Sequence, residues 1–300
     1  MVDLTRAQES PAFPAVARPT VAWGRPKPGF FGLLLLSVTV FYIFLPMIAV
    51  FLYGLATTWT NHVTPDGYTL AHWRDSLADG RFRVVLGRSL ALAIGTAVLD
   101  LLLVTPAVYW QRVRNPRIRP VIEILAAIPF SVPYAVIAFG LLPLSGTYAP
   151  SLQGTLWLLL PAHAAVAFSF AYWAIDSSMA ASNVVGLSEA ARTCGANVAT
   201  TLTRVILPNI MPGLASGAVL AFGVSFNEVA LVQILCGNRF ETVPLYTLNL
   251  LKSTDADFNS LAVMTGITFA ITLVLSVLVV SLNKGRAAAG GTTDAKGAPA

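Results

Sequence analysis

The chain has 300 residues, of which 56% are hydrophobic and only 11% charged, and its mean hydropathy is +0.71. A soluble domain carries roughly a quarter charged residues, so this composition excludes an ordinary water-soluble protein and indicates an all-α membrane protein. The net charge of +5 does not indicate nucleic-acid binding, because basic residues gather in the cytoplasmic loops of membrane proteins. Two cysteines and three scattered histidines form no metal-binding pattern.

Residues 1–29 are rich in Pro and Ala, and we expect them to form a disordered cytoplasmic arm. The first apolar run begins near Phe30 and is about 25 residues long, which exceeds the core of a signal peptide. We therefore expect this run to remain in the protein as a membrane span.

Six stretches are longer than the roughly 18 residues that cross a bilayer. The third contains Pro129 and Pro133, so we expect it to be kinked or broken. These stretches predict a six-span domain over residues 30–283, followed by a disordered cytoplasmic tail at 284–300. The six predicted spans are 31–55, 85–109, 121–142, 154–175, 213–235 and 261–282.

The basic residues predict the orientation of these spans. With the N-terminus inside, thirteen Lys and Arg lie in the inner segments and five in the outer ones. We therefore expect both termini in the cytoplasm, with residues 177–208 forming a cytoplasmic loop. The longest outer segment, 56–84, predicts a small helix and a turn at Pro65-Asp66-Gly67. Its aromatic residues suit either membrane anchors or contacts to an external partner, and these are Trp59, Tyr68, His72 and Trp73.

The loop at 177–208 contains the stretch "EAARTCGANVATTLTRVILP", which is unusually polar for this chain. Ser188 and Glu189 suit the start of a helix, as a capping hydroxyl and an acid at the positive end of the helix dipole. Gly195 then lies inside the helix, where it permits close approach of another backbone, and Pro208 ends the helix at Leu207. One small apolar face follows the helical spacing of Leu187, Ala191, Cys194 and Val198. These residues alone are equally consistent with a helix that docks on another protein and with a helix that only lies at the membrane interface.

Residues 189–208 resemble the signature of permease subunits of binding-protein-dependent ABC importers of type I architecture. Glu189-Ala190-Ala191 is followed after three residues by Gly195 and ends at Leu207-Pro208, with the spacing of that signature. The sequence departs from it at Thr193, where an Asp is common, and at Val205, which replaces an Ile. The resemblance extends over about 31–283 and includes Arg88-Ser89-Leu90, "SFNEVALVQIL" and "ETVPLYTLNLL".

The resemblance implies the six-helix type I permease fold in a bacterial cytoplasmic membrane. It also implies a coupling helix that contacts an ABC ATPase dimer, a second permease subunit (identical or a sister) and an external solute-binding protein. The sequence has no Gly-x-x-x-x-Gly-Lys-Ser/Thr loop, so we expect no cofactor and no catalysis in this chain, with ATP and Mg on the partner. The resemblance assigns the coupling role to Glu189, Ala190, Ala191, Arg192, Gly195, Leu207 and Pro208.

Ionisable residues within spans are costly and therefore indicate functional candidates. We expect Asn227, Glu228 and Asp100 as candidates for the translocation pathway. Glu228 could line a gate, pair with Arg88 or cap a broken helix, and Asp100 could instead make a buried hydrogen bond.

The substrate is less well defined than the class. The later spans resemble permeases for polyamines, ferric iron and phosphonates, which favours a polyamine or other small solute, with a sugar, a phosphonate or iron as alternatives. An ion-gradient-driven secondary transporter would need broken spans at matching positions of both halves. The sequence predicts a break in the third span and none in the fifth or sixth. An intramembrane enzyme would need a nucleophile with a base, or a metal cluster, and the sequence offers neither.

Overall fold

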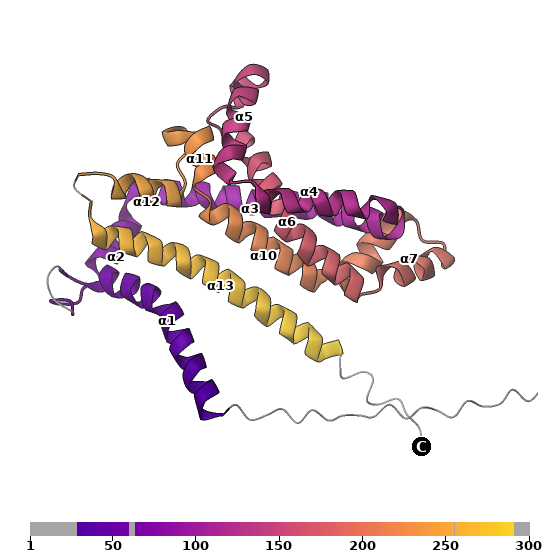
Figure 1. The fold of residues 1–300 in the computed structure, drawn as a ribbon, viewed down its shortest axis with the longest axis horizontal. Coiled ribbons are helices and arrows are strands. Elements are labelled where there is room, and N and C mark those ends of the chain that lie inside the picture. Colours follow the sequence, from indigo (N-terminus) through magenta and orange to yellow (C-terminus); the bar gives the residue numbers. More distant parts are fainter. Residues whose placement is uncertain (1–28, 60–63, 255, 291–300) are drawn as a thin grey trace, which may run out of the picture. The chain divides into compact units, whose positions relative to one another are not determined.

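The computed structural model describes residues 29–59, 64–254 and 256–290 (Figure 1). The chain divides into two units, Met1–Pro46 and Met47–Ala300. In the first unit, the described part is the opening of helix α1 (Phe30–Leu55), whose large apolar side chains are exposed. An exposed apolar helix of this kind suits a lipid or protein environment and not water.

The described residues form helices and no strand, apart from one isolated bridge between Ala56 and Tyr68. This confirms the expected all-α class. After α1 the elements are α2 (Ala71–Ala78), α3 (Gly80–Val113), η1 (Pro116–Ile118), α4 (Arg119–Ser131), α5 (Tyr134–Tyr148), η2 (Pro150–Leu152), α6 (Leu156–Ala181), α7 (Val184–Thr193), α8 (Val198–Thr200), η3 (Thr201–Ile206), α9 (Leu207–Asn209), α10 (Met211–Asn227), α11 (Ala230–Leu235), η4 (Gly237–Phe240), α12 (Val243–Leu251) and α13 (Phe258–Gly290).

Four described helices are long and apolar enough to cross a membrane, namely α1, α3, α6 and α13. Two bent helix pairs raise the number to as many as six if each pair counts as one span. One pair is Pro116–Ser131 with Tyr134–Tyr148, bent by 102°. The break falls at Val132 and Pro133, so the predicted kink of the third span is confirmed, while Pro129 stays inside α4.

The fifth predicted span, 213–235, is not continuous. Helix α10 ends at Asn227 and α11 begins at Ala230, with the extended Glu228 between them. The expectation that the fifth span lacks a break like that of the third is therefore wrong. No Pro or Gly lies at this break. The Glu228 side chain instead caps the new helix by accepting hydrogen bonds from its first amides.

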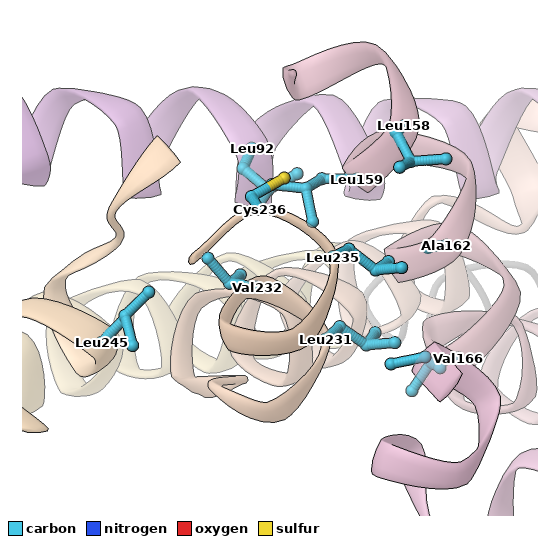
Figure 2. Packing of buried hydrophobic residues seen from close by; sticks show 11 residues of the cluster. Leu92, Leu158, Leu159, Ala162, Val166, Leu231, Val232, Leu235, Cys236 and Leu245 are labelled. Atoms are coloured by element: carbon cyan, nitrogen blue, oxygen red, sulfur yellow. The ribbon is translucent and has the colours of Figure 1, made fainter. Parts of the chain in front are cut away.

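Three helices, α3, α6 and α10, pack together at the centre of the second unit (Figure 1). The short helices that follow the two breaks, α5 and α11, also pack against each other (Figure 1). Figure 2 shows how Leu231 and Leu235 of α11 reach the apolar side chains of α6, with Leu92 of α3 nearby. The second break thus directs α11 into the core.

The segment before α3 contains the predicted small helix, α2. The turn predicted at Pro65-Asp66-Gly67 is not found there, because Asp66 and Gly67 lie in an antiparallel pairing with Thr57 and Thr58. Asp66 N–H donates to the Thr58 carbonyl at 3.1 Å, and Thr57 N–H donates to the Gly67 carbonyl at 2.9 Å. The Trp73 ring stacks on Phe51 at a centroid distance of 6.0 Å. At least this aromatic residue therefore packs within the chain.

Helix α13 runs to Gly290, seven residues beyond the predicted end of the six-span domain at 283. The remaining tail, 291–300, and the arm up to residue 28 lie outside the described residues.

Candidate functional site

Helix α7 begins five residues earlier than the sequence suggested. Asn183, with φ 46°, precedes it as the capping residue, and Asn adopts this left-handed conformation more readily than most residues. Ser188, which we expected near the start, is buried inside the helix, and its hydroxyl donates to the Val184 carbonyl at 2.7 Å. The predicted helix start at Ser188 is therefore wrong.

Gly195 ends α7 and does not lie inside it. Gly195 has φ +80°, its N–H donates to the Arg192 carbonyl at 2.9 Å, and Ala196 N–H donates to the Ala191 carbonyl at 3.0 Å. These two bonds form a Schellman motif, in which glycine is preferred because it adopts positive φ without strain. The predicted interior position is therefore wrong. A Cβ at Gly195 would meet nothing within 4 Å in this chain.

Pro208 does not end the helix either. A new helical stretch begins after Asn197, whose side chain accepts from Thr200 N–H at 2.8 Å, and continues through the π-helical turn η3 into α9. Leu207 N–H donates to the Leu202 carbonyl, one residue further back than in an α-helix. Pro208 lies in the first turn of α9, where its missing N–H does no harm. The chain turns at Ile210 instead, with a bend of 79°.

The residues of the signature divide into an inward and an outward set. Leu207 and the neighbouring Leu187 pack on a buried cluster that includes Met179 and Ile206. Ala191 is half-buried, whereas the remaining signature residues are exposed, and these are Glu189, Ala190, Arg192, Gly195 and Pro208. The predicted single apolar face is therefore not formed, because Cys194 and Val198 are exposed and Val198 belongs to the next helix.

The exposed charges of this segment have no ionic partner in the described part of the chain. Glu189, Arg192 and Arg204 take part in no ion pair within 4.0 Å among residues 64–254. Together, the outward residues of α7 and the following turn form a small charged surface of about one and a half helical turns, which we name the α7 surface (Glu189, Ala190, Arg192 and Gly195).

A buried ion pair, which the sequence did not predict, joins the end of α3 to the last turns of α6, shortly before α7 begins. The Arg112 guanidinium donates from Nε and Nη2 to the two oxygens of Asp176, each at 2.6 Å, and the two side chains are 16% and 5% exposed. Gln111 Nε2 donates to Asp176 at 3.3 Å, and Arg119 Nη2 lies 3.9 Å from it. This network, the Asp176 cluster, joins the end of α3 to α4 and to the last turns of α6. Asp176 lies just beyond the predicted fourth span, so the cost of burying an ionisable residue within a span does not single it out in the sequence.

The three pathway candidates have different surroundings. Asp100 of α3 is 2% exposed, and its Oδ2 has no hydrogen-bond partner among the described residues, so the expected buried hydrogen bond at this atom is not found. Asn227 is exposed and lines a groove of ≈ 360 Å³ with the hydroxyl-bearing Thr247, Thr265 and Thr268. Of the three, Asn227 faces open space most directly.

Glu228 is 7% exposed and acts as a helix cap. Its two oxygens accept from Ala230 N–H at 2.7 Å and Leu231 N–H at 2.9 Å, which satisfies the first amides of α11. Of the three roles expected for Glu228, the hydrogen bonds of its carboxylate support the capping of a broken helix. Arg88 is not its partner, since its guanidinium lies over the Phe240 ring at 5.4 Å.

A chain of polar side chains connects this cap to α6 and α3. His163 Nδ1 lies 2.9 Å from Ser225 Oγ, which donates to Thr96 Oγ1 at 3.2 Å, and His163 Nε2 is 3.9 Å from Glu228 Oε2. His163 is 1% exposed. His163 thus belongs to a polar network at the second helix break.

Comparison with known proteins agrees with this architecture. The chain is 24% identical over 237 residues to the 2-aminoethylphosphonate transport system permease protein PhnV of Salmonella typhimurium, covering 79% of this chain and 87% of that protein. It is 29% identical over 231 residues to the spermidine/putrescine transport system permease protein PotC of Escherichia coli K12, covering 76% and 78%. The solved structure of a bacterial ABC transporter involved in the import of the acidic polysaccharide alginate matches 84% of this chain and 95% of its own with a TM-score of 0.65 and 16% identity, which shows a shared fold.

A family model covers residues 91–286, from the first third of α3 almost to the end of α13. This range contains the α7 surface, the Asp176 cluster and all three pathway candidates. The chain therefore belongs to the family of binding-protein-dependent transport system inner membrane components, the permease subunits of ABC importers.

Proposed function

We propose that this chain forms half of the translocation pathway of a bacterial ABC importer and couples it to a separate ATPase through the α7 surface. The observation that carries the proposal is the exposed Glu189, Ala190 and Arg192, which are presented on a helix whose other side is fixed in the core. Unpaired charges on an anchored helix suit recognition by a protein partner, where complementary charges fix register.

The Asp176 cluster gives this surface a mechanical connection to the spans. The bidentate pair joins α3 to α6, and α7 follows α6 after a short turn at Ser182 and Asn183. A displacement of α7 would be transmitted to both long helices, because packed elements move as units between discrete arrangements. ATP binding and hydrolysis on the partner would supply the two states.

The remaining parts of the transporter are proposed on the same basis. The complex would contain an ABC ATPase dimer carrying ATP and Mg, a second permease subunit and an extracytoplasmic solute-binding protein, all in or on the bacterial cytoplasmic membrane. In the proposed orientation, both termini and α7 would lie in the cytoplasm. The chain itself would catalyse no reaction.

For the substrate we propose a small solute with an ammonium group. Two relatives are named for the transport of 2-aminoethylphosphonate and of spermidine and putrescine, which share an amine and differ in their other groups. Amines are cations at neutral pH because their pKa lies near that of lysine. The Thr hydroxyls and Asn227 of the groove would suit a polar solute of this kind.

The cysteines provide a direct test of the coupling proposal. Cys194 is exposed beside the α7 surface, whereas Cys236 is buried. A membrane-impermeant maleimide should label Cys194 in inside-out vesicles and not in right-side-out vesicles, and bound ATPase should protect it. The Cys194→Ser variant, which retains Cys236, is the control for labelling at the other site. Labelling that the ATPase leaves unchanged would contradict the proposed contact.

A further inference from the structure

A pocket of ≈ 270 Å³ lies between α2, α12 and the start of α13 and shares no lining residue with the groove at Asn227. We name it the acidic pocket. Water occupies about 30 Å³ per molecule in the liquid, so the pocket has room for a solute of several heavy atoms. It is lined by Asp75, Ser76, Asp79, Tyr246, Leu250, Asp257, Ser260 and Met264.

The three carboxylates that line the pocket differ in the hydrogen bonds that they already accept within the chain. Asp79 accepts from Arg81 N–H and Phe82 N–H and so caps α3, while Asp257 accepts from Asn259 N–H and from the Ser260 hydroxyl near the start of α13. Asp75 is exposed and its side chain makes no hydrogen bond or ion pair with any described residue. Since each carboxylate has about four acceptor positions, capping leaves acceptors free on Asp79 and Asp257 as well.

A buried hydroxyl in the same pocket lacks a partner. Ser76 is 4% exposed, and its Oγ has no hydrogen-bond partner among the described residues. Buried polar groups in native proteins are almost always paired, because leaving one without a partner is costly. The unpaired Oγ therefore points to a ligand or a water that bonds to it in the pocket.

The charges around the pocket favour a cation. Arg81 lies beside it but is paired with Glu241 at 2.9 Å and stacked over the Tyr246 ring at 5.0 Å. Burial raises the pKa of the Tyr246 phenol, which stays protonated and donates to Asp79 Oδ2 at 3.3 Å. Neither Arg74 nor Arg83 forms an ion pair with these carboxylates in the described part of the chain.

The donor arrangement distinguishes an organic cation from a metal ion. No group of three or more His, Cys, Asp or Glu side chains in the described residues is arranged to hold a metal ion. An ammonium group, in contrast, needs only separate acceptors around three N–H bonds, and charge-assisted bonds to carboxylates are the strong ones. The apolar Leu250 and Met264 would contact the carbon chain.

We propose that the acidic pocket binds the ammonium end of a small organic amine, with Asp75 and the Ser76 hydroxyl as its main ligands. The inference rests on the proposed function, because an outward-facing amine pocket concentrates an amine substrate at the entrance of an importer. Asp75, Ser76 and Asp79 lie outside residues 91–286, the range that the family model matches.

The test uses the full-length chain in lipid nanodiscs with ethylammonium as the probe and saturation-transfer NMR as the measurement. A ligand with three heavy atoms binds with a Kd of about 1 mM or weaker, a range in which this method works. We expect transfer to ethylammonium that putrescine competes away, and none to methylphosphonate, which has no ammonium group.

Two substitutions locate the binding. Asp75→Asn removes the uncommitted charge and should weaken binding about tenfold, and Ser76→Ala should weaken it about threefold. Asp66→Asn is the matched control, because Asp66 is an exposed carboxylate of the same segment outside the pocket and its bond from Thr58 Oγ1 can be kept by the amide oxygen.

Three results would overturn the inference. These are the absence of transfer in the wild type, equal transfer in Asp75→Asn and the control, and competition by Mg²⁺ or Ca²⁺ stronger than by putrescine, which would make the pocket a metal site. None of them affects the proposed coupling to an ATPase, which fails only if no ATPase binds the α7 surface.

Discussion

The Asp176 cluster provides the sharpest prediction for stability. Asp176→Asn removes one partner of a bidentate pair with two 2.6 Å bonds and leaves the Arg112 guanidinium, only 16% exposed, without its counter-charge. Removal of one partner from a fully buried pair costs about 3–5 kcal/mol. Because Arg112 keeps some solvent contact, we expect a loss of about 2–3 kcal/mol in the free energy of unfolding.

An exposed ion pair at the edge of the same cluster gives a comparison for this measurement, since Arg119 Nη2 also lies 3.9 Å from Asp176. Arg119 and Glu123 form an ion pair at 2.8 Å on the surface of α4, with side chains 48% and 33% exposed. Such i,i+4 pairs contribute about 0.3–0.5 kcal/mol, so Glu123→Gln should change stability by that amount. Unfolding titrations in mixed micelles measure both variants under the same conditions.

A double-mutant cycle then isolates the pair itself. Arg112→Gln combined with Asp176→Asn should cost less than the sum of the single losses, with a coupling of about 1–3 kcal/mol. If Asp176→Asn costs no more than Glu123→Gln, or if the two losses simply add, the cluster does not hold α3 and α6 together and the mechanical argument fails.

The other predictions concern three residues whose roles the geometry defines. Gly195→Ala places a residue with a Cβ at φ +80°, which costs about 1 kcal/mol, so this variant should co-purify with less ATPase. Gly195→Asn should retain the ATPase, because Asn tolerates positive φ. Equal retention by the two variants would contradict the conformational role of Gly195. Gly213→Ala puts a Cβ against Ser178 Cβ and 3.0 Å from the Ala174 carbonyl oxygen and should cost about 1–3 kcal/mol in mixed-micelle unfolding, while Gly223→Ala in the same helix meets nothing within 4 Å and should not destabilise; similar losses would show that close packing of α10 on α6 is unimportant. Glu228→Ala removes both bonds to the α11 amides and should cost about 1 kcal/mol, with Glu228→Gln milder because its amide oxygen still accepts; no loss in the Ala variant would show that the cap is dispensable.

The four long apolar helices could be predicted, because lipid imposes a length and an apolar composition that are visible in the hydropathy of the sequence. The bend at Pro133 was also predictable, since proline removes a backbone donor. Capping of a broken helix by Glu228 was one of three alternatives, and the sequence could not select it, because the cap depends on a side chain that accepts two amides of the next helix and is surrounded by ordinary helix formers. A single carboxylate in an apolar run gives no sign of which amides it will cap.

The local conformation of the signature segment differs from the one predicted from the sequence. Spacing singled out Gly195, but glycine serves both close approach and positive φ, and only the backbone distinguishes them. Pro208 was assigned to a helix end because the π-turn before it cannot be seen in the sequence. The pair of Arg112 and Asp176 joins residues 64 apart, and the acidic pocket joins α2 to α13, so both depend on tertiary packing.

The central claim is that this chain works with a separate ATPase, and purification from the native membrane tests it most directly. Gentle extraction followed by mass spectrometry should find an ABC ATPase and a second six-span subunit with the wild-type chain. The ATPase should be lost when Glu189 and Arg192 are both replaced by Ala. An intact chain that brings no ATPase, or a double variant that brings as much as the wild type, would contradict the account.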